Sequence, residues 1–271
     1  MKEYNFDPEK YTKECIEWIR QFFDKNNFEK AVLGISGGKD SSVVAALCSK
    51  AIGNDNVIGV MLPNGEQKDI SDSKKIIEFL NINSKLVNIS DAYNAVKNSI
   101  QKTASEEVNK NLRFATNTPS RLRMVILYGI CSLEKKALVA NTCNLSEEVL
   151  GYSTFFGDSC GDFAPINSFT VSEVMMIGDY LGLPHELVHK TPSDGMCGSS
   201  DEEALSNILG LRFSYKDLDN LIRKGYSERK EKDDKEFSDV IKERYNSMKY
   251  KSETIQIKNY NSDLPNYLVE K

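Results

Sequence analysis

The sequence lacks long hydrophobic runs and any segment that resembles a secretion signal. No stretch approaches the ~18 unbroken apolar residues that a membrane-spanning helix needs. The first residues, Met1 to Asp7, are too polar for a signal peptide. We therefore expect a cytoplasmic protein that does not bind a membrane.

Cysteine pairs and a strong excess of one charge are also missing. None of the six cysteines forms a Cys-x-x-Cys pair, so neither a disulfide framework nor a cysteine zinc site is indicated, and we expect mostly buried, reduced thiols. The 35 Lys+Arg and 40 Asp+Glu residues give a net charge of −5. This balance argues against a general nucleic-acid-binding protein, because neutralisation of phosphates dominates such binding.

The 271 residues are enough for one large domain or two small ones. We expect a single α/β domain over residues 1–271. One stretch, 223–235, crowds lysines, arginines and acids around Gly225. We expect it to be a mobile, solvated segment without a specific role.

Apolar runs alternate with amphipathic stretches over the first half of the chain. This alternation, with mostly short links, predicts an open parallel sheet with helices on both faces, a doubly wound, Rossmann-like fold. A helix-start signal, Thr118-Pro119-Ser120, precedes one of the helices. Strands are predicted over 31–35, 57–62, 85–89 and 137–140, and helices over 11–26, 41–51, 69–80, 91–110, 121–134, 170–181 and 215–223.

A glycine turn joins the first predicted strand to the next helix. Backbone N–H groups converge at such a turn, and the helix dipole adds positive potential, so the turn can hold phosphate. The spacing fits neither a Walker A loop, which needs Ser or Thr where Asp40 stands, nor a Gly-x-Gly-x-x-Gly fingerprint. A carboxylate beside polyphosphate is repulsive unless Mg²⁺ lies between them, so Asp40 indicates a metal. The turn reads Ser36-Gly37-Gly38-Lys39-Asp40-Ser41.

This string resembles the signature of the ATP pyrophosphatase (PP-loop) superfamily, and the chain from about residue 10 to 255 resembles the ammonia-dependent NAD synthetases. The resemblance implies an adenine nucleotide alpha hydrolase-like fold, a homodimer, and ATP with Mg²⁺. Further matching segments are Gly59 to Pro63, Asn117 to Arg123, Asn141 to Glu147, Gly157 to Pro165, Pro192-Ser193, Asp201 to Glu203 and Tyr215 to Asp219.

The resemblance also implies a two-step reaction. The nicotinate carboxylate of deamido-NAD attacks the α-phosphate of ATP and releases pyrophosphate, and ammonia then displaces AMP to form the amide of NAD. Lys39 would offset the anionic charge in the first step. Asp158 could take a proton from ammonium in the second.

The same resemblance assigns the remaining site residues. It places the ATP phosphates on the glycine turn and its flanks. It places ATP on Gly34, Ile35, Ser36, Gly37, Gly38, Lys39, Asp40, Ser41, Thr142 and Ser193, Mg²⁺ on Asp40 and Glu147, and deamido-NAD on Arg121 and Asp162.

Three positions depart from the family pattern. Phe155 and Val171 stand where the family usually has lysine, and Met248 stands where it usually has histidine. Ligands for ATP and the acceptor are therefore missing at these positions. Lys190 and Lys249 are candidates to replace them.

Other functions compete with this hypothesis. One is another PP-loop adenylating enzyme that acts on tRNA or on a small molecule, and a second is a binding protein that kept the turn but lost catalysis. A third is a zinc hydrolase, since His185-Glu186-Leu187-Val188-His189 matches His-Glu-x-x-His. Pro184 and Pro192 leave this match only about two helical turns, so its context is poor.

Overall fold

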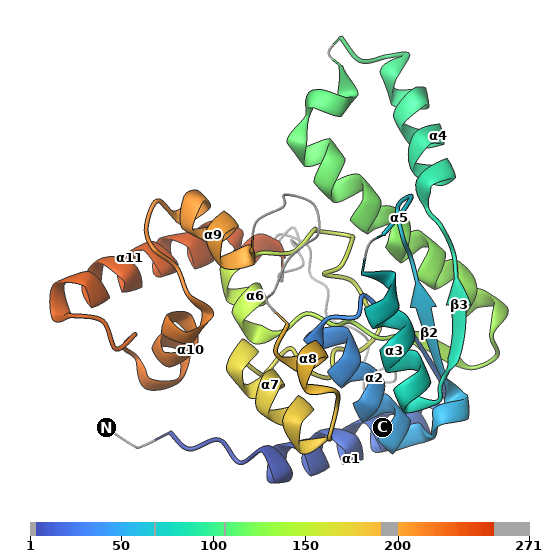
Figure 1. The fold of residues 1–271 in the computed structure, drawn as a ribbon, viewed down its shortest axis with the longest axis horizontal. Coiled ribbons are helices and arrows are strands. Elements are labelled where there is room, and N and C mark those ends of the chain that lie inside the picture. Colours follow the sequence, from blue (N-terminus) through green and yellow to red (C-terminus); the bar gives the residue numbers. More distant parts are fainter. Residues whose placement is uncertain (1–3, 68, 106, 191–199, 252–271) are drawn as a thin grey trace, which may run out of the picture.

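Four parallel strands form one sheet. β2 and β3 are seen on the side of the molecule opposite α10 (Tyr215–Lys224) and α11 (Glu231–Met248) (Figure 1). The structure is a computed structural model that describes residues 4–67, 69–105, 107–190 and 200–251. The strands pair in the order β3-β2-β1-β4, which confirms the predicted open parallel sheet. Their bounds are β1 (Lys30–Gly34), β2 (Val57–Met61), β3 (Asn83–Leu86) and β4 (Ala137–Val139).

Successive side chains of β1 point to opposite faces of the sheet, and each face has its own core. Ala31 and Leu33 join the core formed with α1 (Pro8–Asn26), α2 (Lys39–Ile52), α3 (Ile70–Leu80), α7 (Val171–Tyr180) and α8 (His185–Val188). Val32 joins the core formed with α5 (Leu112–Leu133) on the other face. α4 (Ser90–Gln101) packs on α5 through Tyr93 and Phe114, whose ring centroids lie 5.9 Å apart. Helices therefore cover both faces, as the sequence predicts.

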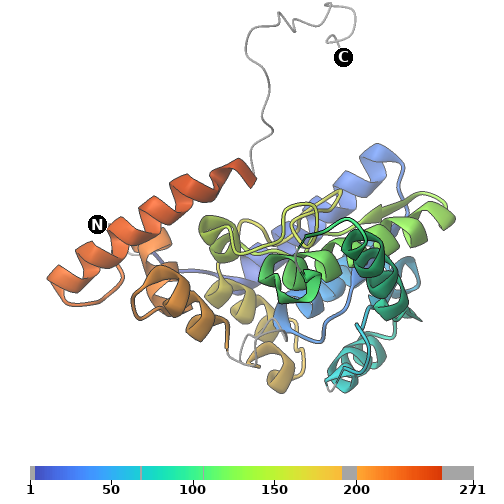
Figure 2. The same ribbon diagram turned by 90° about the horizontal axis from the view of Figure 1, so that it is seen from above.

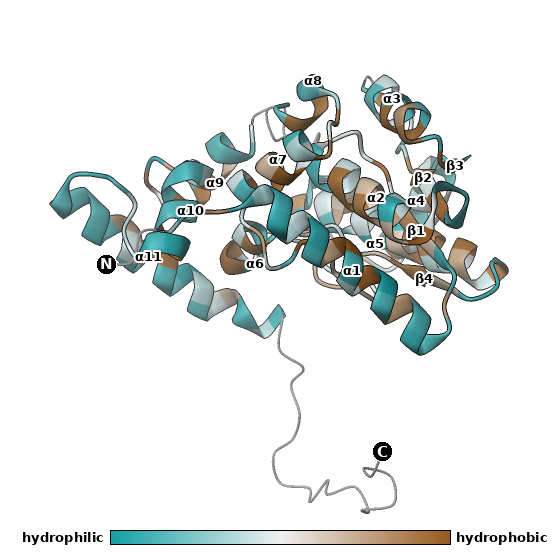
Figure 3. Ribbon diagram, turned by 90° about the horizontal axis from the view of Figure 1, so that it is seen from below, coloured by the Kyte–Doolittle hydropathy of each residue, from teal (hydrophilic) through white to brown (hydrophobic). Residues whose placement is uncertain are grey.

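The second half of the chain builds a third cluster beside the sheet. It contains Leu150, Leu205, Leu218 and Phe237 at its core. Figures 1 and 2 show these helices set to one side, and Figure 3 shows that α11 is mostly hydrophilic whereas brown residues gather in α2. The cluster consists of α6 (Leu145–Leu150), α9 (Asp201–Leu209), α10 (Tyr215–Lys224) and α11 (Glu231–Met248), with the start of α7.

The predicted start of the helix near Arg121 is wrong. α5 begins at Leu112, where the side chain of Asn111 accepts a hydrogen bond from the Phe114 N–H, and Pro119 lies buried inside it. Proline is common in the first turn of a helix, so Thr118-Pro119-Ser120 imitates a start signal. Tertiary packing of the long helix outweighs the ~3 kcal/mol that an interior proline costs.

Two other predicted bounds are shifted. β3 ends at Leu86, although the Val87 and Ile89 N–H groups still donate to the Met61 and Pro63 carbonyls, so an extended run does continue. The helix predicted over 91–110 ends at Gln101. The Ile100 carbonyl accepts from the backbone of Thr103 and Ala104 and closes it.

The charged stretch 223–235 lies in α10, α11 and the turn between them. Arg223 forms an ion pair with Glu173, and Arg229 pairs with Asp217 while its guanidinium lies 4.0 Å from the centroid of the Phe237 ring. These two arginines therefore make specific contacts, whereas the sequence predicts a solvated segment without a specific role. Its mobility and the single-domain organisation stay predictions.

Among the described residues, no helix has the length and apolar character to cross a bilayer. The described cysteines are unpaired thiols. Cys197 and Ser193 lie outside the described residues.

Candidate active site

The proposed ATP residues that the structure describes, which exclude Ser193, lie in two segments at the carboxyl ends of β1 and β4. β1 lies between β2 and β4, so the strand order reverses on either side of it. The segment Ser36 to Ser41 joins β1 to the first turn of α2, and the segment Asn141 to Glu147 joins β4 to the first turn of α6. The carboxyl ends of strands at such a reversal are where open α/β sheets bind ligands. Topology alone therefore brings the two predicted ATP segments together.

The glycine turn is shaped by its packing against α3. Gly37 has φ +81°, and an added Cβ would lie 2.6 Å from the Asp72 Cβ and 2.7 Å from the Ser73 backbone nitrogen. Only glycine fits this conformation and this approach. Gly38, the residue before α2, supplies no side-chain cap. The first turn of α2 thus presents its backbone N–H groups to an anion.

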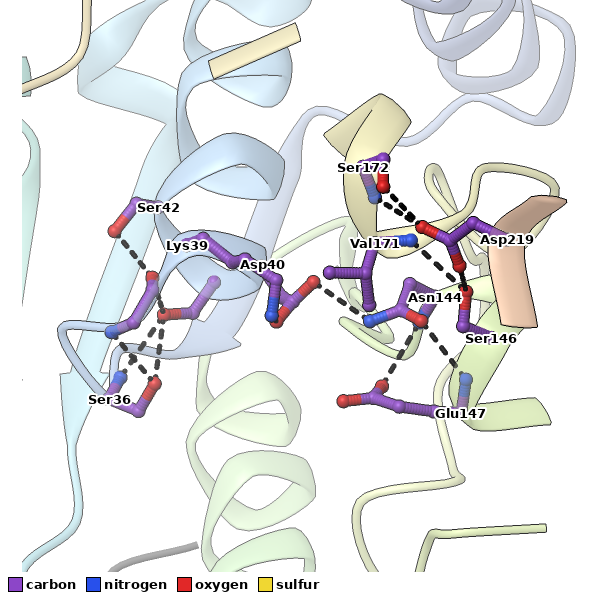
Figure 4. Close-up of polar contacts among 12 residues, drawn as sticks. Ser36, Lys39, Asp40, Ser42, Asn144, Ser146, Glu147, Val171, Ser172 and Asp219 are labelled. Atoms are coloured by element: carbon purple, nitrogen blue, oxygen red, sulfur yellow. Dashed lines mark hydrogen bonds and ion pairs between the residues drawn. The ribbon is translucent and has the colours of Figure 1, made fainter. Parts of the chain in front are cut away.

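Hydroxyl groups close the turn internally. The Ser36 Oγ accepts a hydrogen bond from the Gly38 N–H at 3.2 Å, and the Ser42 Oγ donates to the Gly38 carbonyl at 2.7 Å (Figure 4). The Ser41 Oγ accepts from the Ser36 N–H at 3.3 Å. These bonds hold the turn in one shape before any phosphate arrives, which lowers the entropy cost of binding.

Asn144 links the two loops. Its Nδ2 donates to the Asp40 Oδ1 at 3.0 Å, while its Oδ1 accepts from the Glu147 N–H at 3.0 Å (Figure 4). The Asn144 N–H donates in turn to the Glu147 Oε2 at 3.2 Å. These last two bonds form a capping box at the start of α6. One side chain therefore caps a helix and fixes the Asp40 carboxylate beside it.

A buried ammonium completes this cluster. The Lys39 side chain is 6% exposed, and its Nζ lies 2.9 Å from the Asp40 Oδ2. Burial lowers the pKa of Lys39, but the negative charges of Asp40 and Glu147 outweigh it, so the net pKa is raised. Lys39 therefore stays cationic at the point where polyphosphate is expected.

The pKa of Glu147 is raised as well, which for a carboxyl group favours the neutral form. Burial, and then the neighbouring charge of Asp40, raise its pKa to about 8, although Lys39 acts against this. Even with the Lys39 ammonium nearby, this shift favours the protonated form of Glu147 at neutral pH in the absence of a divalent cation. Paired carboxylate oxygens are hard donors that suit Mg²⁺, so Asp40 and Glu147 fit the ion that the resemblance implies. No cluster of three or more acidic, histidine or cysteine ligands occurs in the described ranges.

Asp158 stands on a loop that is docked against α5. Its Oδ1 accepts from the Ser120 Oγ at 2.5 Å and from the Thr154 N–H at 2.9 Å. The Ser120 Oγ also accepts from the Asp158 N–H at 2.9 Å. Asp158 itself remains exposed. An oriented carboxylate that still meets solvent can accept a proton.

Arg121 and Asp162 flank this loop. The Arg121 Nε donates to the Phe155 carbonyl at 3.1 Å. The Asp162 Oδ2 accepts from the Val139 N–H at 2.8 Å, and its Oδ1 accepts from the Tyr128 hydroxyl at 3.1 Å. Asp162 is therefore tied to the end of β4 and to α5. The substrate roles of both residues stay predictions.

The remaining predicted ligand-binding residues, Thr142, Lys190 and Lys249, lie in three different parts of the structure. Thr142 is partly buried in the loop after β4. Lys190 forms ion pairs with Asp69 and Asp72 at 2.8 and 2.7 Å, beside the α3 turn that supports Gly37. Lys249 follows α11. Lys190 would have to exchange these partners to reach a ligand.

Apolar packing occupies the three positions where the family pattern is broken. Val171 is 4% exposed in the cluster of the C-terminal helices, and the Met248 side chain lies over Gly151. Phe155 packs against the Phe156 ring with centroids 3.9 Å apart. The missing cationic and polar groups have therefore been replaced by packing.

The His-Glu-x-x-His match does not form a zinc site. α8 ends at Val188, the Glu186 carboxylate pairs with Lys75, and the His189 Nε2 lies 2.9 Å from the Asp179 Oδ1. Each key side chain is thus engaged with a structural partner. The two imidazole rings stack with centroids 4.1 Å apart.

Sequence reasoning missed Asn144 and Ser120 as site residues. The sequence presents Asn144 only as part of a resembling segment, yet its position three residues before Glu147 is a helix-capping signal that could have been used. Ser120 looks like part of a helix start. Its contact with Asp158 spans 38 residues, and nothing in the local pattern indicates it.

Comparisons with known proteins assign the family. A family model described as NAD synthase matches residues 11–261. The chain belongs to the NAD synthase family. Members of this family are ligases, and their fold and nucleotide-binding character agree with the site above. The alternatives of a tRNA-directed enzyme and a zinc hydrolase are not favoured.

Individual relatives of the chain are described as NH(3)-dependent NAD(+) synthetases. It is 35% identical over 219 residues to an NH(3)-dependent NAD(+) synthetase of Thermococcus sibiricus, covering 80% of this chain and 81% of the relative. It is 34% identical over 262 residues to one of Fusobacterium nucleatum, covering 93% and 96%.

Solved structures are similar over nearly the whole chain. NMN synthetase from Francisella tularensis has a TM-score of 0.80 at 28% identity, covering 94% of this chain and 100% of the other. The NH3-dependent NAD synthetase from Campylobacter jejuni, in complex with nitrate, has a TM-score of 0.69 at 25% identity, covering 93% and 99%.

Replacement of Gly37 tests the fit between the turn and α3. Gly37→Ala combines left-handed backbone strain with a clash against Asp72, so we expect the free energy of unfolding to fall by ~2 kcal/mol or more, with loss of ATP binding. Gly65→Ala is the matched control, because Gly65 has φ +80° and nothing within 4 Å. Urea unfolding and ATP titration calorimetry measure both effects. Equal losses in the two variants would contradict this account.

Proposed function

We propose that the protein converts a nicotinate carboxylate to its amide, with deamido-NAD as acceptor, ATP as the activating nucleotide and ammonia as the nitrogen donor. One arrangement carries the proposal. The glycine turn, the buried Lys39 and the Asp40–Asn144–Glu147 link meet at the carboxyl ends of β1 and β4. This arrangement supports the binding of a polyphosphate at the turn, with a cation held by the two carboxylates.

The first step forms a bond between the acceptor carboxylate and the α-phosphorus of ATP and breaks the bond to the β-phosphate. Two anions must approach each other, so the site has to offset negative charge. Lys39 does this with its buried ammonium, and the first amides of α2 donate to the leaving pyrophosphate. Mg²⁺ held by Asp40 and Glu147 would neutralise charge on the phosphates.

The second step is attack by ammonia on the acyl-adenylate, which expels AMP. Only neutral ammonia has the lone pair for this attack, whereas ammonium dominates in neutral solution. Asp158 is held by Ser120 and Thr154 and faces solvent. We assign it the role of taking the proton from ammonium.

A mononucleotide acceptor is the second candidate. The structural likeness to the Francisella tularensis NMN synthetase is higher, at TM-score 0.80, than that to the Campylobacter jejuni NAD synthetase, at 0.69. Phe155, Val171 and Met248 also replace residues that bind ligands in the usual family pattern. The reaction would be the same, with the nicotinate mononucleotide in place of the dinucleotide.

We also propose a cytoplasmic homodimer. α5 carries Val125 at 67% exposed and Leu133 at 86% exposed, with Gly129 between them, where an added Cβ would meet nothing within 4 Å. These residues lie four apart and share one helix face. Exposed apolar residues that gather on one face mark an interaction surface.

A product assay tests the reaction class. With deamido-NAD, ATP, Mg²⁺ and ammonia together, we expect AMP, pyrophosphate and NAD in equal amounts. The ratio of kcat/KM for the dinucleotide to kcat/KM for the mononucleotide shows which of the two is the preferred acceptor. Asp40→Asn should lower kcat by ~100-fold or more, since it weakens the metal and phosphate site. Formation of ADP in place of AMP would exclude the proposed chemistry.

The pH dependence of metal use tests Glu147. Its pKa of about 8 means that below this pH Mg²⁺ must displace a proton, whereas above it the carboxylate is already free. The ratio of MgATP affinity to metal-free ATP affinity should therefore fall as pH decreases from ~9 to ~7, approaching tenfold per pH unit below the pKa. Glu147→Gln should remove this slope in titration calorimetry. A wild-type ratio independent of pH would contradict the assignment.

Substitution on α5 tests the dimer. We expect Val125→Lys to move the mass measured by light scattering from dimer to monomer, because a buried unpaired ammonium is unfavourable at an interface. Phe79→Lys, on α3 and 51% exposed, is the control that should leave the dimer intact. A wild-type monomer, or a dimer unaffected by Val125→Lys, would refute this part of the proposal.

A further inference from the structure

Asp219 is a buried carboxylate that belongs to none of the groups used above. It lies on α10 with 6% of its surface exposed. Its Oδ1 accepts from the Ser146 Oγ at 2.6 Å, and its Oδ2 accepts from the Ser172 N–H at 2.8 Å and the Ser172 Oγ at 2.6 Å (Figure 4). Burial raises its pKa, while the bonds from Ser146 and Ser172 act against this. A charge that costs desolvation energy is thus held by two serines on different helices.

The Ser146 hydroxyl connects three helices. It donates to Asp219 on α10 and accepts from the Val171 N–H at the start of α7 at 3.1 Å. Ser146 itself lies in the first turn of α6, between Asn144 and Glu147. Asn144, two residues before Ser146, holds Asp40, and Glu147, the next residue after Ser146, accompanies Asp40 in the site.

α6 has only six residues and cannot set its own direction. Isolated helices of this length are not stable in water, so contacts at their ends must fix them. The Arg244 Nε donates to the Leu150 carbonyl at 2.8 Å and holds the end of the helix. Asp219, through Ser146, holds its beginning, which is the end that carries Asn144 and Glu147.

α10 has a second attachment that does not involve α6. Arg223 donates to both carboxylate oxygens of Glu173 on α7, at 2.7 and 2.6 Å. The bonds from Asp219 to Ser172 reach α7 as well. If Asp219 served only to attach α10 to the body of the protein, its bond to Ser146 would be redundant.

We propose that Asp219 is a positioning residue for the metal-binding carboxylates: it fixes the start of α6 so that Asn144 and Glu147 face Asp40. This inference rests on the proposed function for the role of the metal with ATP. It does not depend on which acceptor is amidated. The C-terminal helices thereby contribute to a site whose proposed metal ligands lie in the first turns of α2 and α6, which follow β1 and β4.

Two serines on the same carboxylate provide a matched test. Ser146→Ala removes the link from Asp219 to α6, together with the acceptor of the Val171 N–H. Ser172→Ala removes a hydroxyl but leaves the Ser172 N–H bonded to Asp219. Titration calorimetry without acceptor measures the affinity for ATP with Mg²⁺ and with EDTA, and thermal unfolding reports the stability of each variant. Ser146→Ala should weaken MgATP binding by ~10-fold, as loss of indirect ligand support does. Metal-free ATP binding should change little, and Ser172→Ala should leave both affinities within ~2-fold.

If Ser146→Ala fails to fold, Asp219→Asn is the second variant, because it conserves the volume of the side chain. It should show the same selective loss of MgATP affinity. In the double variant the two losses should not add. Equal weakening of MgATP and metal-free ATP, or equal effects of the two serine variants, would show a merely structural role and overturn the inference. A selective loss in an enzyme that forms no amide from either acceptor would support the inference and refute the proposed function.

Discussion

Two carboxylates that repel each other, Asp40 and Glu147, are held side by side, and the rest of the site depends on this juxtaposition. Asn144 makes it possible, because its amide donates to Asp40 while its oxygen and backbone cap the helix that carries Glu147. The cost appears in the pKa of Glu147, raised to about 8 by burial and then by Asp40. Lys39 offsets part of the charge. A divalent cation bound with polyphosphate would offset the remainder.

The fold supplies the surroundings that this pair needs. The reversal of strand order at β1 brings the glycine turn and the Asn141–Glu147 loop to one edge of the sheet. α3 fixes the turn through the close approach of Asp72 to Gly37. The helical cluster beside the sheet fixes the other loop through Asp219 and Ser146. Rigid support on both sides keeps the charged side chains close together, although their mutual repulsion and their hydration by water favour separating them.

Local chemistry made part of this predictable from sequence. The turn at Gly37 could be recognised because glycines between an apolar run and an amphipathic stretch have few other uses, and the alternating pattern indicated the fold class. The start of α5 was mistaken because Pro119 in a helix interior looks like proline at a helix start. Asp219 could not be found, since its partner Ser146 lies 73 residues away. Such contacts depend on how helices pack, which no local pattern encodes.

The proposed chemistry transfers adenylate from ATP to a carboxylate, with pyrophosphate as the leaving group. Exchange of labelled pyrophosphate into ATP in the absence of ammonia isolates the reversible first step. We expect exchange that requires both Mg²⁺ and a nicotinate nucleotide. Absence of exchange under those conditions, in an enzyme that still forms the amide when ammonia is added, would contradict the adenylate intermediate.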